Sequence, residues 1–302
     1  MKPDWTSTMT HVKHVLAATD LSAPARHAVE RAAMVSHETG ASLDLLHVAN
    51  LALLERLRQS MLAQPEALQQ QVLGTARDNL AELVEVLRGR YGVSARARVL
   101  SGSLLVELTR EAQAVAADLI VCGARGESFM RHLLLGSTTE RMLNRMPCPM
   151  LVVKQVAHEP YRTLLVPVDF SPSSLRAIGH AQAVAPRATL VLLHVFEVPF
   201  EGQLRYASVD DKVIQQYRTL ARQEASQKLH ALCAQAGLAP QAVRLAVLHG
   251  DPAQRIIEQE QEHNCDLIVM GKHGESPLED LLIGSVTKRV LDDSQCDVLV
   301  SV

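Results

Sequence analysis

A glycine-rich string that occurs twice constrains this chain more than any other feature. Both copies follow the pattern Gly-x-x-Gly, nine residues, Gly-Ser, and the second copy begins 148 residues after the first. The motif residues are Gly123, Gly126, Gly136 and Ser137 in the first copy and Gly271, Gly274, Gly284 and Ser285 in the second. Two copies in register within 302 residues indicate a duplicated domain that carries one string in each half.

Each copy of the string lies between a predicted strand and a predicted helix. Residues 118–122 and 266–270 are short apolar runs with the length and β-branched content of buried parallel strands. Helix-forming sequence starts at Ser137 and at Ser285. Glycine lets backbone N–H groups approach an anion, and a helix N-terminus adds unpaired donors, so the string is suited to phosphate. The alternative is that the glycines only turn the chain and let helix and strand pack closely.

These residues resemble the universal stress protein family, whose ATP-binding members carry Gly, two residues, Gly, nine residues, Gly and then Ser or Thr. Both copies match this pattern without a gap, and the flanking segments extend the resemblance over essentially the whole chain as a tandem pair. The resemblance implies ATP as the ligand, and it leaves open whether Mg²⁺ accompanies it. It also implies a stress-response regulator or sensor that acts through nucleotide-dependent conformation or partner binding.

The alternation of apolar runs and helical segments predicts an α/β fold. Such an order calls for a mostly parallel sheet with helices on both faces. We expect two tandem, doubly wound, five-stranded sheets, in domains 1–156 and 157–302, with the Rossmann-like fold of the adenine nucleotide α-hydrolase type that the resemblance implies. The expected strands are 14–19, 42–48, 93–100, 118–122 and 150–153, followed by 163–168, 188–195, 241–248, 266–270 and 297–302.

The last predicted strand of each half is an apolar run that would promote aggregation if its edge were left bare. The linker between the halves, residues 154–162, is also short. We therefore expect the halves to pair through these strands as a pseudo-twofold unit. The family resemblance implies dimerisation through the same strand, and we expect the chain to form a homodimer.

The predicted site lies beyond the carboxyl ends of the strands, where the winding direction of such a sheet reverses. The resemblance implies that Asp20 and the backbone at Val48 hold ribose and adenine, and that Gly123, Gly126 and Gly136 line the phosphate path. It assigns Ser137 and Thr138 to the phosphate oxygens. The matching residues of the second half are Asp169, Val195, Gly271, Gly274, Gly284, Ser285 and Val286. Val286 lacks the hydroxyl of Thr138, a departure that family members accommodate by using the backbone there.

The composition is that of a soluble globular protein, with 47% apolar residues and a formal net charge of -3. No basic excess suggests nucleic acid as a partner. No apolar run approaches the roughly 18 residues that cross a bilayer, and residues 1–7 lack the apolar core of a signal peptide. We expect a cytoplasmic protein without a membrane partner.

Cysteines and histidines indicate packing rather than metal or disulfide chemistry. The five cysteines are odd in number and form no Cys-x-x-Cys pair, so we expect buried thiols. Cys122 is the one candidate for a role other than packing, because it directly precedes the first glycine string. His47 and His194 occupy equivalent strand ends, and no histidine has the spacing of a metal ligand, so we expect structural roles and no metal site.

No pair of acid and base at a fixed spacing indicates catalysis, and we assign no catalytic residue. The string is not a Walker motif, since no Lys-Ser or Lys-Thr follows its last glycine. We expect a protein that is not an enzyme, with at most slow ATP hydrolysis. Two alternatives stay open: an interaction module that has kept the fold and lost the ligand, and an enzyme such as a slow ATPase or a nucleotidyl transferase. The sequence does not identify a protein partner.

Overall fold

A computed structural model describes residues 11–49, 65–124, 135–198, 201–207, 209–274 and 283–302, and all structural statements refer to these residues. The strands are β1 (His14–Ala18), β2 (Ser42–Ala49), β3 (Ala95–Ser101), β4 (Leu119–Gly123), β5 (Met150–Val153), β6 (Thr163–Pro167), β7 (Thr189–Phe196), β8 (Val243–His249), β9 (Leu267–Gly271) and β10 (Asp297–Ser301). The helices are α1 (Ala23–Thr39), α3 (Pro65–Tyr91), α4 (Leu104–Ala114), α5 (Ser137–Arg145), α6 (Pro172–Val184), α7 (Glu201–Tyr206), α8 (Asp211–Gln235), the 3₁₀ turn η1 (Pro240–Ala242), α9 (Pro252–Glu262) and α10 (Ser285–Asp293).

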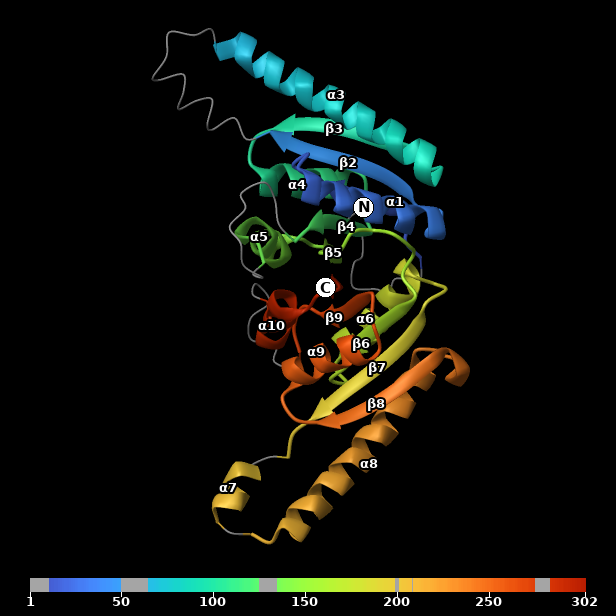
Figure 1. Cartoon of the computed structure of the whole chain (residues 1–302), viewed down its shortest axis with the longest axis vertical. Coiled ribbons are helices and arrows are strands. Elements are labelled where there is room, and N and C mark those ends of the chain that lie inside the picture. The colour runs from blue at the N-terminus through green and yellow to red at the C-terminus, as the bar shows by residue number, and fades with distance from the viewer. Residues whose placement is uncertain (1–10, 50–64, 125–134, 199–200, 208, 275–282) are drawn as a thin grey trace.

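All strands belong to one continuous sheet of ten, in the order β3-β2-β1-β4-β5-β10-β9-β6-β7-β8 (Figure 1). Each half contributes five parallel strands in the doubly wound order, as expected. The halves join where β5 pairs antiparallel with β10, with Leu151 opposite Leu299. The predicted pairing of the halves through their last strands is therefore confirmed.

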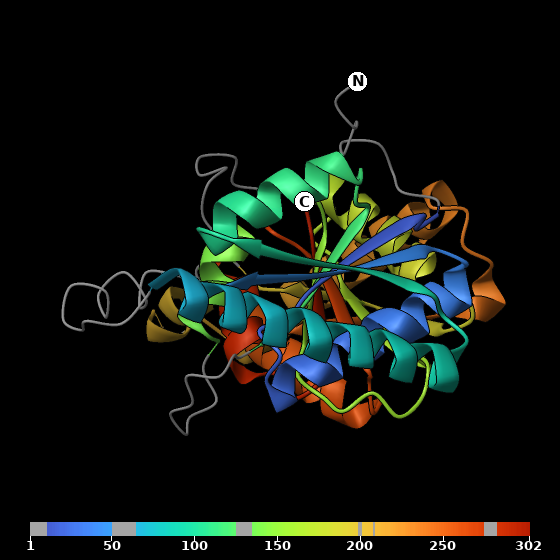
Figure 2. The ribbon, with the colours of Figure 1, turned by 90° about the horizontal axis from the view of Figure 1, so that it is seen from above.

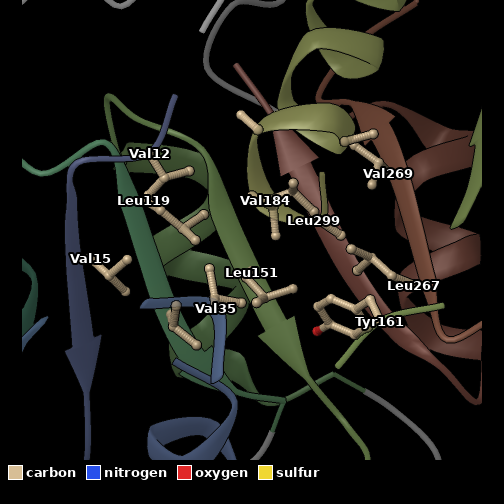
Figure 3. Close-up of a cluster of buried hydrophobic side chains, with 14 of the residues drawn as sticks. Val12, Val15, Val35, Leu119, Leu151, Tyr161, Val184, Leu267, Val269 and Leu299 are labelled. Carbon is tan, nitrogen blue, oxygen red and sulfur yellow. The ribbon is translucent and has the colours of Figure 1, made fainter. Parts of the chain in front are cut away.

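Helices cover both faces of the sheet (Figure 2). Helices α1, α3, α6 and α8 share a single core cluster that runs through both halves. Figure 3 shows Leu151 of β5, Leu299 of β10 and Tyr161 of the linker within this cluster. On the opposite face, α4 and α5 cover the first half and α9 and α10 the second. Because one face has a common core, the two halves form a single packed body.

Local sequence explains most of the helix boundaries. The Ser22 hydroxyl accepts a hydrogen bond from Ala25 N (3.3 Å) at the start of α1, and Gly40 ends that helix with a φ of 72°. Asp251 caps α9 in the same way through Gln254 N (2.8 Å). Helix α3 begins at Pro65, and proline is well suited to the first position of a helix.

The short helix α7 carries no signal of its own in the sequence. Helix α7 has only six residues, so no apolar repeat could identify it. Its first residue, Glu201, pairs with Arg218 of α8 and with His249 Nε2 at the end of β8 (2.9 Å). These tertiary contacts, which the local sequence does not reveal, hold this helix in place.

A buried carboxylate joins the two halves beside the β5–β10 junction. Asp297, at the start of β10, has no exposed surface. Its Oδ1 accepts from the backbone N–H groups of Lys154 (2.8 Å) and Gln155 (3.1 Å). Its Oδ2 accepts from the Tyr161 hydroxyl (2.7 Å) and pairs with Arg31 Nε of α1 (3.2 Å). This single carboxylate therefore binds the linker and the first half at once.

We predict that Asp297→Ala destabilises the whole chain by about 3–5 kcal/mol, because it leaves the buried Arg31 guanidinium without its counter-charge. Equilibrium unfolding in urea measures the loss. The control is Asp293→Ala, which removes an exposed carboxylate and should change the free energy of unfolding by less than about 0.5 kcal/mol. A similar small change for both variants would contradict the role of Asp297.

In the other half, the buried pair of His180 and Ser301 takes the place of the Arg31–Asp297 ion pair. His180 of α6 occupies the position equivalent to Arg31, and its Nδ1 lies 2.7 Å from the Ser301 hydroxyl. Burial, with a smaller contribution from the positive charge of Arg176, lowers the pKa of His180 from 6.5 to about 4. The folded protein therefore holds a neutral imidazole where the unfolded chain binds a proton below pH 6.5.

The stabilisation from neutral His180 should be complete above pH 6.5 and disappear as the pH falls toward 4. With a shift from 6.5 to about 4, the loss in unfolding free energy is at most about 3 kcal/mol. Urea titrations at several pH values compare the wild type with His180→Asn, which keeps a polar side chain but does not titrate. Identical pH profiles for the two proteins would show that His180 is not responsible.

Candidate functional site

The candidate site of the second half lies where the winding direction reverses. Strands β6 and β9 are neighbours in the sheet, and the segments that follow them leave toward opposite faces, α6 on one and α10 on the other. The carboxyl ends of these strands and of β7 open onto a cavity of about 660 Å³. Its position agrees with the rule for open α/β sheets.

All seven residues predicted for the second half line this one cavity. They are Asp169, Val195, Gly271, Gly274, Gly284, Ser285 and Val286. One part of the wall is apolar and includes Val168, Leu193, Ile256 and Met270. The lining also includes Gly271, Gly274 and Gly284 of the glycine string and Ser285 of the first turn of α10. A cavity lined by both apolar side chains and polar groups accommodates a ligand that has an apolar ring and an anionic group.

Asp169, which lines the cavity, is held in a fixed orientation. Its Oδ1 accepts from Ser171 N (3.0 Å) and from the hydroxyls of Ser171 and Ser174 (both 2.6 Å). Ser171 thereby uses its hydroxyl for Asp169 and makes no capping hydrogen bond to α6, whereas Ser22 caps α1. A Cβ added to Gly274 would lie 2.9 Å from Asp169 Oδ2, so this oxygen faces the glycine string.

The glycine string approaches its neighbours too closely for side chains. A Cβ on Gly271 would lie 3.0 Å from both His273 O and Ser173 Cβ. Hydrogen bonds from Gly284 N to Lys272 O (2.9 Å) and from the Thr287 hydroxyl to Gly271 O (2.9 Å) close the loop. Gly284 caps α10 without a side-chain hydrogen bond, so the first N–H groups of that helix have no capping side chain.

The first half repeats this arrangement where it is described. Gly136 N donates to Ala124 O (3.0 Å), and the Thr139 hydroxyl donates to Gly123 O (3.1 Å). Ser137 and Thr138 are the exposed first residues of α5, whose N-cap is Gly136, again without a side-chain capping bond. Asp20 lies just after β1, Val48 lies near the end of β2, and Gly123 is the last residue of β4. Gly126 lies outside the described residues.

Backbone strain marks both sites at equivalent positions. Leu21 and Phe170, which directly follow Asp20 and Asp169, have φ values of 67° and 66°. A left-handed conformation is unfavourable for such side chains and persists only where the surroundings impose it. His47 Nδ1 bonds Thr19 O (2.9 Å) and His194 Nδ1 bonds Val168 O (2.8 Å), so the two histidines fix the strand ends that carry these turns. The structural role predicted for both histidines is confirmed.

Sequence reasoning missed several residues at this edge. Thr139 and Thr287 hold equivalent carbonyls, and comparison of the two strings would have identified them because both carry threonine two residues after the serine. Ser173, Ser174 and His273 line the cavity and have no identical counterpart in the first half. No signal in the sequence distinguishes them from ordinary polar residues.

The cysteine that directly precedes the first glycine string is buried. Burial raises the pKa of the Cys122 thiol to about 12, so this cysteine stays protonated at neutral pH and is a poor nucleophile. All five cysteines are free and all but Cys233 are buried, which confirms the predicted packing role for those four.

The described part of the chain contains no cluster of three or more His, Cys, Asp or Glu side chains that could hold a metal ion. None of its helices is both long and apolar enough to cross a membrane.

Comparisons with known proteins agree with the duplicated architecture. The model of the universal stress protein family matches residues 11–154 and again residues 160–301. A universal stress protein of Methanocaldococcus jannaschii is 34% identical over 143 residues, which cover 46% of this chain and 81% of that protein. One of Mycolicibacterium smegmatis is 25% identical over 299 residues, or 95% of this chain and 96% of the relative.

A solved structure gives the same architecture. The crystal structure of a universal stress protein from Archaeoglobus fulgidus aligns with a TM-score of 0.67 over 95% of this chain and 97% of that one. The two sequences are 21% identical, so this similarity concerns the fold.

Proposed function

Since the chain belongs to the universal stress protein family, as a tandem member, we propose that it is a nucleotide-responsive stress protein whose halves each bind ATP. Occupancy by ATP alters the shape of the protein or its binding to a partner. We place the domain boundary between residues 156 and 157 and the protein in the cytoplasm.

One observation carries this proposal. Seven residues that are separated by up to 117 positions in the chain, from Asp169 to Val286, surround a single cavity. Its volume of about 660 Å³ falls within the range of small-molecule pockets, roughly 300–1,000 Å³. The alternative, that the glycines serve only packing, does not explain an apolar hollow beside an uncapped helix N-terminus.

The residues of the second half fit the parts of ATP. The apolar wall, with Val168, Leu193 and Val195, suits the adenine ring, and Asp169 Oδ2 would accept from the ribose hydroxyls. Gly271, Gly274 and Gly284 leave space for the phosphates, which Ser285 and the first N–H groups of α10 would bind. In the first half, Asp20, Val48 and the turn Gly136-Ser137-Thr138 would do the same. Any Mg²⁺ would be carried on the phosphates.

We also propose that the chain forms a homodimer, but through a surface other than the last strand of each half. The resemblance implied dimerisation through the last strand of a domain. Here β5 and β10 pair with each other inside the chain, so both strands already have partners. Two chains would need to associate through a different surface.

We predict that the purified protein releases adenine nucleotide on denaturation, identified by mass spectrometry, and that calorimetry with ATP detects two sites per chain. Gly274→Val should remove the second-half site, because its side chain enters the space beside Asp169 Oδ2. Gly89→Ala is the control, since a Cβ there meets nothing within 4 Å. A chain that releases no nucleotide and does not bind ATP would instead favour the interaction module.

We also predict that any hydrolysis of ATP is slow, well below the median enzyme turnover of about 10 per second. The physical reason is that no acid and base pair has been identified at the site. A phosphate-release assay measures the rate. Turnover near that median value, lost in Ser137→Ala, would contradict the prediction and favour an enzyme.

A further inference from the structure

The two helices that start at the candidate phosphate sites lie against each other across the boundary between the halves. Helix α5 of the first half and α10 of the second face one another (Figure 1). Leu291 of α10 belongs to the same buried cluster as Met142 and Leu143 of α5. Lys288 Nζ binds Glu140 Oε1 at 2.8 Å, which links the first turns of the two helices.

One contact from the second half reaches the residue that directly precedes the candidate phosphate site of the first half. The Asp292 carboxylate, near the end of α10, accepts a hydrogen bond from Leu135 N at 3.2 Å. Leu135 immediately precedes Gly136, the N-cap of α5, and Ser137, its first residue. Because the Asp292 carboxylate holds the Leu135 amide, it also sets the position of the backbone that leads into α5. Asp292 lies far along α10 from Ser285, where that helix begins.

The equivalent contact in the opposite direction has a different chemistry. Asn144 of α5 occupies the position that matches Asp292, and its side-chain oxygen is buried without a hydrogen bond in the described structure. Its backbone oxygen accepts from Lys272 Nζ of the second glycine string (3.0 Å). A carboxylate therefore supports a backbone amide of the first string, whereas a lysine side chain anchors the second.

We propose that Asp292, although it belongs to the second half, is a positioning residue of the nucleotide site in the first half. The inference rests on the proposed function and adds a specific dependence to it. Asp292 touches no nucleotide and acts through Leu135, which sets the position of Gly136 and Ser137. The first-half site is then incomplete without α10.

The experiment uses the full chain and ATP as the probe. In the Gly274→Val background, where titration reports the first-half site, Asp292→Ala should weaken ATP binding by about fivefold or more, as expected for loss of a charge-assisted hydrogen bond. Asp292→Asn keeps an oxygen acceptor for Leu135 N and should restore most of the affinity. Asp293→Ala, one residue along on the exposed side of α10, should leave it unchanged.

A readout at the other site separates positioning from general damage. In the otherwise wild-type chain, Asp292→Ala should leave the second-half affinity unchanged, although Asp292 lies on the helix whose N-terminus forms that site. Loss of affinity at the second-half site, or equal affinities for Asp292→Ala and Asp293→Ala at the first, would overturn the inference while the proposed function stands. Absence of ATP binding by the wild type would overturn the proposed function itself, and with it this inference.

Discussion

The antiparallel pairing of β5 with β10 is the constraint on which the rest of the structure depends. It converts two five-stranded sheets into one, and it brings the apolar faces of both halves into a common core. The buried carboxylate of Asp297 stabilises this junction by binding two linker amides, the Tyr161 hydroxyl and Arg31. Because this pairing places the two halves side by side, it also brings α5 next to α10.

The candidate sites follow from this arrangement and from the winding of each half. A doubly wound sheet leaves a hollow between strands whose connections go to opposite faces, and in the second half Gly271, Gly274 and Gly284 line the cavity at that place. In the second half, Asp169 is fixed by three donors, and the α10 N-terminus has no capping side chain. A carboxylate held by hydrogen bonds and a helix N-terminus without a capping side chain therefore both line the second-half cavity.

The two halves are not identical copies, and the differences lie where the halves meet or where a ligand would bind. Arg31 and His180 occupy equivalent positions, yet one pairs with a carboxylate and the other with a hydroxyl. Ser22 caps its helix, while Ser171 turns its hydroxyl to Asp169. The two halves share one fold because of the duplication, and substitutions at single positions give each half its own contacts.

The sequence by itself determined the class of fold, the duplication and seven of the residues that line the second-half cavity. Short β-branched runs, caps such as Asp251 and the glycine spacing act through neighbouring residues, so their signals are local. Only the tertiary structure decided the six-residue α7, the partner of Arg31 and the reach of Asp292 to Leu135. Those features depend on residues more than 15 positions apart, 157 in the case of Asp292, and no pattern within either segment encodes the other.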